Sequence, residues 1–146
     1  MECSLYMERL PYIDEHAIDV GAAPRQRIWS ALVEVLRRET AGGEQIARAL
    51  GCEPSASSPH FDGSPGQTIP GFRVAAAVRG QRLVLRGRHR FSHYELTFLL
   101  DDGRLRAQTR AAFPGLLGRM YRAAVIGTRG HRLATRHLLR QVARRA

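Results

Sequence analysis

Four strand-like runs follow one another between residues 72 and 113, and this series constrains the fold more than any other feature of the chain. The runs are Phe72–Val78, Arg82–His89, His93–Leu100 and Leu105–Phe113, separated by short turn-forming stretches. Connections of this length join antiparallel neighbours in one sheet. In the last run, Leu, Ala, Thr and Phe alternate with Arg and Gln, which predicts one buried face and one face in water.

Before this meander, the pattern predicts one strand and two helices. Tyr12–Val20 is expected to form the first strand, with Ile13 facing water and His16 facing the interior. Pro24 begins a helix, since proline is tolerated in a first turn, and apolar residues recur behind it at helical spacing. Glu44–Leu50 predicts a second, shorter helix. Residues 51–71 are expected to form a loop with one or two short strands.

After Pro114 and Gly115, the pattern predicts one long amphipathic helix to Ala146, bent near Gly127 and Gly130. Its predicted buried stripe comprises Leu117, Met120, Tyr121, Ala124, His131, Thr135, Leu138 and Val142. Arginines occupy the opposite side: Arg122, Arg129, Arg136, Arg140 and Arg144. Ile126 and Leu133 lie off this pattern, so the sequence leaves both a monomer and a homodimer open.

The length suits a single domain. The chain has 146 residues, of which 44% are hydrophobic and 25% charged, values typical of a globular protein with one core. Together with the element order, this predicts one α+β domain over residues 1–146, with residues 1–11 as an N-terminal extension.

The net charge of +10 raises nucleic acid as a partner. All 23 basic residues are arginine, however, which is typical of the coding bias of GC-rich bacteria. The charge therefore carries less information about partners than its size suggests. Nucleic-acid or protein binding through the arginine face of the last helix stays as an alternative of lower weight.

Cys3 and Cys52 have neither CxxC spacing nor a disulfide framework, which favours two free thiols in the cytoplasm. No stretch approaches 18 uninterrupted apolar residues, so we expect a cytoplasmic protein with no membrane insertion.

The junction between the first strand and the first helix carries a resemblance to a known family. The run Val20-x-Ala22-Ala23-Pro24-x-x-x-Ile28-Trp29-x-x-Leu32 resembles the corresponding junction of the SRPBCC superfamily, also called START-like or helix-grip proteins. Its bacterial polyketide cyclase/dehydrase and lipid-transport-like members are the most similar. Gly66-Gln67-Thr68, followed by Pro70–Val74, resembles the family's next landmark, a turn feeding the long strands.

The resemblance implies a helix-grip fold, in which a curved antiparallel sheet of about six or seven strands wraps around a long C-terminal helix. A cavity between sheet and helix binds lipids, sterols, polyketides or other mostly apolar molecules in such proteins, and a minority cyclise or dehydrate bound polyketides. Fold alone does not choose between these functions. No cofactor is expected.

Candidate ligand-binding residues follow from the expected faces of the sheet and the last helix. They are Trp29, Phe72, His89, Tyr94, Phe113, Leu117, Met120, Tyr121 and His131. His131 is also the candidate catalytic residue, because an imidazole in an apolar face can act as an acid or base. A hydrogen-bonded core histidine explains it equally well.

The sequence gives little support for nucleotide-dependent, hydrolytic or metal-dependent chemistry. The chain contains no nucleotide-binding loop, GxSxG, HExxH or CxxC motif. His89 and His93 have a spacing that can bring two imidazoles to one metal, but a turn near Phe91 and Ser92 intervenes and no third ligand is evident, so no metal is expected.

Three hypotheses remain at this stage. The first is binding, transport or sequestration of a hydrophobic small molecule. The second is an aromatase/cyclase or dehydrase with His131 as base and Arg or Tyr side chains polarising a carbonyl. The third is the regulator that uses the arginine face.

Overall fold

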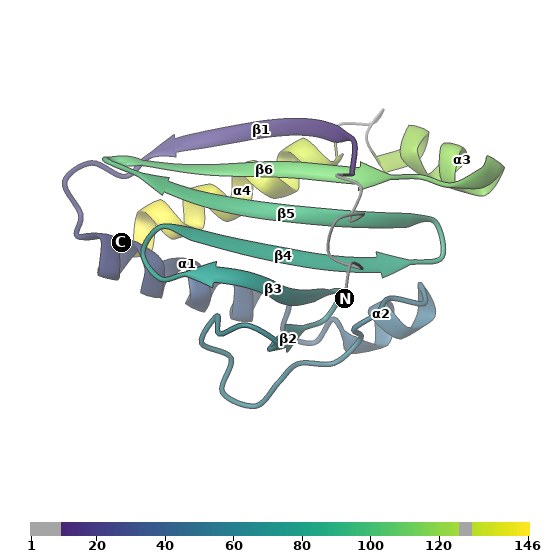
Figure 1. Cartoon of the computed structure of the whole chain (residues 1–146), viewed down its shortest axis with the longest axis horizontal. Coiled ribbons are helices and arrows are strands. Elements are labelled where there is room, and N and C mark those ends of the chain that lie inside the picture. Colours follow the sequence, from purple (N-terminus) through teal and green to yellow (C-terminus); the bar gives the residue numbers. More distant parts are fainter. Residues whose placement is uncertain (1–9, 126–129) are drawn as a thin grey trace, which may run out of the picture.

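One antiparallel sheet and four helices make up the part of the chain that the structure describes, residues 10–125 and 130–146 of a computed structural model (Figure 1). In chain order the elements are β1 (Tyr12–Asp19), α1 (Arg25–Glu39), α2 (Glu44–Ala49), β2 (Thr68–Ile69), β3 (Phe72–Val78), β4 (Arg82–His89), β5 (Ser92–Asp101), β6 (Arg104–Ala112), α3 (Gly115–Val125) and α4 (Gly130–Arg145). The α+β class is therefore confirmed.

The sheet has six strands in the order β1-β6-β5-β4-β3-β2, all antiparallel. The predicted meander is confirmed, since β3 to β6 are consecutive neighbours. Its tight turns use Gly80 and Gly103, whose φ angles of 77° and 74° favour glycine. Along β6, the residues Leu105, Ala107 and Thr109 are buried, while their neighbours are not, as the alternation predicted.

The junction between β1 and α1 shows why its residues are small. Gly21 adopts a φ of 61°, and its N–H donates to Asp19 Oδ1 at 2.8 Å, which turns the chain off the sheet edge. Pro24 then stands at the N-cap of α1. The next turns bury Ile28, Trp29 and Leu32. The chain thus enters the helix with its apolar face already directed at the sheet.

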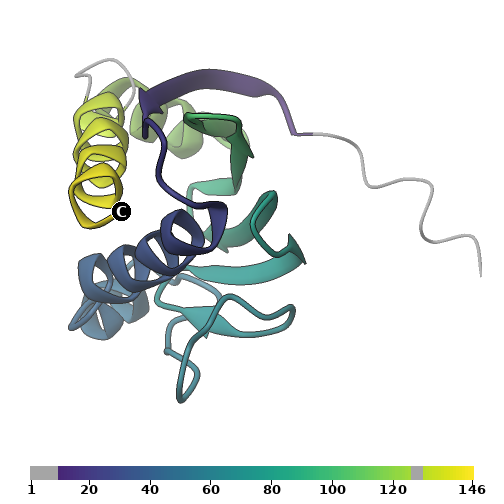
Figure 2. The same cartoon turned by 90° about the vertical axis from the view of Figure 1, so that its left-hand side faces the viewer.

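The core lies between the sheet and the two helices that cover one of its faces, α1 and α4 (Figure 2). Leu83 and Leu85 of β4 are fully buried, as is Val142 of α4. The C-terminal helix α4 packs against α1, β1 and β6. Each of the helices in the described ranges is too short or too polar to cross a membrane.

The C-terminal region differs from the single long helix that the pattern predicted. The structure records two helices, α3 and α4; Ile126, Gly127 and Arg129 lie outside the described residues. The stripe holds for Thr135 and Val142, which are 8% and 0% exposed. It is wrong for α3, where Leu117 and Met120 are 65% and 62% exposed.

The position of α3 explains this difference. The helix begins where β6 ends, at one end of the sheet, so little of its surface faces the core (Figure 1). Its contact with the β4–β5 hairpin is made through Gly118, where a Cβ would lie 3.1 Å from the Phe91 carbonyl oxygen, and through Tyr121, which stacks on Phe91. A helical period finds an apolar stripe, but it does not show whether a sheet lies beneath it.

Candidate functional site

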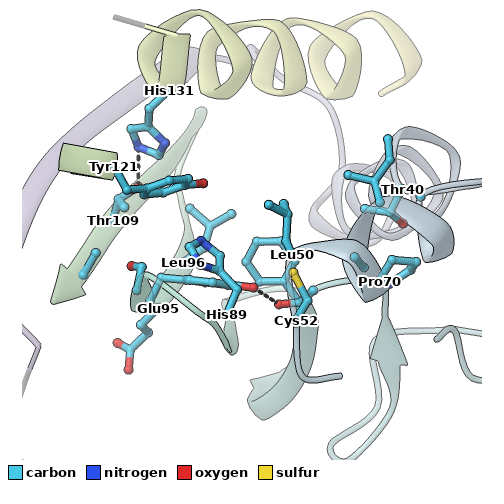
Figure 3. A pocket seen from close by; sticks show the side chains of 18 of the residues that line it. Thr40, Leu50, Cys52, Pro70, His89, Glu95, Leu96, Thr109, Tyr121 and His131 are labelled. Atoms are coloured by element: carbon cyan, nitrogen blue, oxygen red, sulfur yellow. Dashed lines mark hydrogen bonds between the residues drawn. The ribbon is translucent and has the colours of Figure 1, made fainter. Parts of the chain in front are cut away.

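A cavity of about 410 Å³ lies on the inner side of the sheet, beside α2 and the first turn of α4 (Figure 3). Its walls are mainly apolar and aromatic. Ile46, Ala47 and Leu50 line it from α2; Leu96, Ala111 and Phe72 line it from the strands. Ile46 is 67% exposed, which places it at the mouth. The cavity falls in the size range of small-molecule sites.

His131 and Thr109 line one end of this cavity and belong to a polar cluster with Asp14 and His16, which are not among the lining residues. His131 Nε2 lies 3.0 Å from Thr109 Oγ1 and 3.3 Å from Asp14 Oδ1. The other carboxylate oxygen of Asp14 lies 3.3 Å from His16 Nε2. The Thr135 hydroxyl donates to the His131 backbone carbonyl at 3.0 Å, on the first turn of α4. Because the Asp14 and His131 side chains are only 14% and 21% exposed, this pair is shielded from solvent and its hydrogen bonds carry more weight than surface ones.

The strand register brings Asp14 to this position. Asp14 pairs with Thr109 across β1 and β6, two residues before His16, so it shares the interior face predicted for His16. A register shift between Tyr12 and Asp14 makes Ile13 the extra residue of a bulge. Ile13 consequently lines the cavity, contrary to the prediction that it faces water. The strand parity of Asp14 was the signal in the sequence that could have identified it as the partner of His131.

An aromatic cluster lies at another part of the cavity, where His89, Tyr94 and Tyr121 contribute to the lining. The rings of His89 and Tyr121 pack edge to face with centroids 4.7 Å apart, and the ring of Phe91 stacks on Tyr121 at 5.4 Å. The Tyr94 hydroxyl donates to the Gly71 carbonyl oxygen, and its ring meets Phe72 at 5.2 Å. Gly87 permits this arrangement, since a Cβ there would overlap the Gly71 carbonyl.

The tautomer of His89 follows from its surroundings. The backbone N–H of Phe91 donates to His89 Nδ1 at 3.0 Å, so Nδ1 carries the lone pair and Nε2 carries the proton of the neutral ring. Burial, and secondarily the charge of His93, lowers the pKa of His89. The neutral imidazole is therefore the form present around pH 7.

The phenols of Tyr94 and Tyr121 and the thiol of Cys52 are also held neutral. Burial is the main cause that raises the pKa of Tyr94 and of Tyr121, with nearby Cys52 adding to both. Burial likewise raises the pKa of the Cys52 thiol, which lines the cavity. A thiol with a raised pKa is a weak nucleophile, so the geometry favours Cys52 as a wall residue.

Six of the nine predicted ligand-binding residues line the cavity: Phe72, His89, Tyr94, Phe113, Tyr121 and His131. The other three do not. Trp29 is buried in the core under α1, and Leu117 and Met120 are exposed on α3. Residues that the sequence reasoning did not propose also line it, among them Cys52, Thr109 and Ala111.

His89 and His93, which have a spacing that can suit a metal, lie on the two strands of one hairpin and face opposite sides of the sheet. His89 pairs with Ser92, a buried residue, whereas His93 pairs with Arg88 and is exposed. Within residues 10–125 and 130–146, no three His, Cys, Asp or Glu side chains gather to hold a metal ion.

Comparisons with known proteins support a relationship at the level of fold. No family model and no curated protein matches the chain. Protein CV1439 from Chromobacterium violaceum is similar in structure, with a TM-score of 0.50 and 15% identity over 89% of this chain and 93% of that one. Protein Mll3558 from Rhizobium loti has a TM-score of 0.49 and 18% identity, with 90% of this chain and 94% of that chain covered. Protein Ms6760 from Mycobacterium smegmatis has a TM-score of 0.49 and 14% identity, with 91% of this chain and 95% of that chain covered. The chain shares a fold with CV1439. Identities this low do not transfer a function.

Proposed function

We propose that this protein binds a small, mostly apolar molecule in the cavity between the sheet and α4. The observation that carries the proposal is the cavity itself: its walls are apolar, and the polar groups of His131, Tyr121 and His89 converge on it from three elements (Figure 3). A cavity of about 410 Å³ accommodates a two- or three-ring compound or a short lipid.

The SRPBCC resemblance supports the same proposal. The junction motif at Val20–Leu32 joins β1 to α1, the meander forms one antiparallel sheet, and a C-terminal helix packs on the sheet. Membership would make the ligand a lipid-like, polyketide-like or aromatic molecule. Sequestration or transport of such a molecule requires no catalytic group.

Filling the cavity tests the proposal. Ala111 lines the cavity, and Ala112, the next residue along β6, points to the opposite face of the sheet. We expect the neutral dye N-phenyl-1-naphthylamine to bind saturably to the unaltered protein, with a rise in fluorescence. Ala111→Phe should weaken binding at least tenfold, whereas Ala112→Phe should leave it within about twofold.

Native mass spectrometry of the purified protein complements the dye. A reproducible extra mass, lost on denaturation and absent from Ala111→Phe, would identify the class of the ligand. Equal dye binding by both phenylalanine variants, or none by the unaltered protein, would contradict the proposal.

The Asp14–His131 pair favours a second candidate, an enzyme of the aromatase/cyclase or dehydrase type. A carboxylate that accepts from an imidazole orients the ring and stabilises its protonated form, which a general base requires. Asp14→Asn and His131→Gln would then abolish turnover of a polyketide-like substrate and change its affinity little. Equal loss of affinity and turnover would support binding alone.

A further inference from the structure

The cavity lining carries almost no charge, although the chain is strongly basic. No arginine within residues 10–125 and 130–146 appears among the residues that line it. The one acidic residue of the described lining, Glu95, pairs with Arg86 at 2.7 Å, and its carboxylate points away from the cavity centre in Figure 3. A buried carboxylate or phosphate on a ligand would require a cationic partner, because an unpaired charge is costly to bury. The described lining offers none.

His89 supplies a hydrogen-bond donor. Its Nδ1 is occupied as the acceptor for Phe91 N–H, so Nε2–H is the remaining polar group of the ring. This N–H has no partner among the described residues. Its surroundings are aromatic, with Tyr94 and Tyr121 at centroid distances of 5.6 and 4.7 Å. A ligand that supplies an acceptor to this unpaired donor therefore binds more favourably than a ligand without one.

His131 supplies the complementary acceptor. A carboxylate oxygen only accepts hydrogen bonds, so Asp14 fixes the proton of His131 on Nε2. Nδ1 then carries the lone pair, and no described residue donates to it. The two imidazoles of one cavity thus present opposite hydrogen-bonding roles. Tyr121 lies between them in Figure 3, with its hydroxyl directed into the cavity.

We propose that the ligand is an uncharged hydroxy-carbonyl compound, whose carbonyl oxygen accepts from His89 Nε2–H and whose hydroxyl donates to His131 Nδ1. The inference rests on the proposed function, since it names the class of molecule that the same cavity takes. It excludes fatty-acid anions and phosphorylated lipids. The hydrocarbon part of the ligand contacts the apolar walls that α2 and the strands provide.

Four probes with one naphthalene skeleton separate the contributions of the polar groups. They are 6-(hydroxymethyl)-2-acetonaphthone, 2-acetonaphthone, 2-naphthalenemethanol and 2-naphthoate, each used to displace N-phenyl-1-naphthylamine at pH 7.5. The hydroxy-ketone should bind about 3- to 10-fold more tightly than either compound with one polar group, as expected for one net hydrogen bond. The carboxylate should be the weakest.

The outcomes distinguish the two proposals. If the dye itself does not bind, the proposed function fails. If the dye binds and 2-naphthoate competes as well as the hydroxy-ketone, only the inference about ligand class is overturned. The same holds if all four probes bind equally.

Variants and NMR complete the test. His89→Phe retains a ring against Tyr121 but removes Nε2–H, so it should abolish the preference for the hydroxy-ketone over 2-naphthalenemethanol, which lacks the carbonyl. His93→Phe changes an exposed residue and should leave that preference unchanged. Imidazole ¹⁵N shifts of the unaltered protein should show both His89 and His131 protonated on Nε2, and the hydroxy-ketone should perturb Nδ1 of His131. A proton on Nδ1 of either ring would overturn the proposal without any variant.

Discussion

Replacing Gly87 by alanine tests how tightly the cavity wall of Tyr94 and Gly71 is built. A Cβ on Gly87 would lie 1.9 Å from the Gly71 carbonyl oxygen and 2.8 Å from Tyr94 Oη. Non-bonded carbon and oxygen atoms approach to about 3.3 Å, so the carbonyl would have to retreat by roughly 1.4 Å. The Gly71 N–H, which donates to the Pro54 carbonyl oxygen at 2.8 Å, resists this movement.

The cost follows from the groups that must move. Retreat of the carbonyl breaks its hydrogen bond from Tyr94, worth a net ~1 kcal/mol. Displacing packed atoms costs ~1–3 kcal/mol more. We therefore expect Gly87→Ala to lower the free energy of unfolding by ~2–4 kcal/mol, and to weaken dye binding because Tyr94 and Gly71 line the cavity.

Urea unfolding followed by circular dichroism measures the loss. Gly21→Ala is the comparison, because a Cβ at Gly21 meets nothing within 4 Å and only its φ of 61° opposes the change, at a cost of ~1–2 kcal/mol. In a Tyr94→Phe background, Gly87→Ala should cost less, since the hydrogen bond is already lost. A Gly87→Ala protein as stable as the unaltered one would refute the reasoning, because alanine in an unobstructed strand is favoured over glycine by ~0.5–1 kcal/mol.

Two further predictions concern the start of α1 and the buried phenols. Arg25 donates to the Leu100 and Gly80 carbonyl oxygens at 2.8 and 3.3 Å, so Arg25→Met should lower the free energy of unfolding by ~1–3 kcal/mol in the same assay. Asp102→Asn, which removes only an exposed ion pair to Arg25, should cost under ~1 kcal/mol; equal losses would be inconsistent with this division. Because the pKa of Tyr94 is raised on folding, the unfolded chain releases this proton first, and stability should fall as pH rises above about 10. Tyr94→Phe should reduce that slope, and an unchanged slope would count against the burial argument.

The fold was predictable wherever the signal is local. The hairpins of the meander need only turn residues and a two-residue alternation, and each strand lies within two residues of its predicted bounds. Local signals could not show that the predicted single C-terminal helix was wrong. Leu117 and Met120 satisfy the helical period as well as Val142 does, but only Val142 has a sheet and a second helix to pack against. Whether an apolar stripe is buried depends on the elements that pack against the helix, and the periodicity of the sequence does not reveal those elements.

The site was predictable in its residue types and not in its pairings. His131 was identified from its place in an apolar face, yet the sequence offered no partner at a local spacing. Asp14 is 117 residues away, and it reaches His131 because β1 closes against β6 with Asp14 opposite Thr109. The unbroken pairing from Asp14 with Thr109 to Asp19 with Arg104 sets this register, and the bulge shifts only the pairing of Tyr12. A one-residue slip would turn Asp14 outward and leave His131 without its carboxylate.

The many arginines are the most obvious feature of the sequence, yet they give little information about the cavity. On the outer side of the sheet, Arg86 pairs with Glu95, and Arg106 pairs with Glu15 and Asp101. Each guanidinium thereby stays close to water and an acid, which costs less than entering an apolar cavity. Strand alternation then separates the two faces: positions that carry arginine outward leave their neighbours small or apolar inward, as along Leu105–Ala111. The high charge of the chain and the uncharged lining of its cavity are thus two results of one pattern, and the ligand should be sought among neutral molecules.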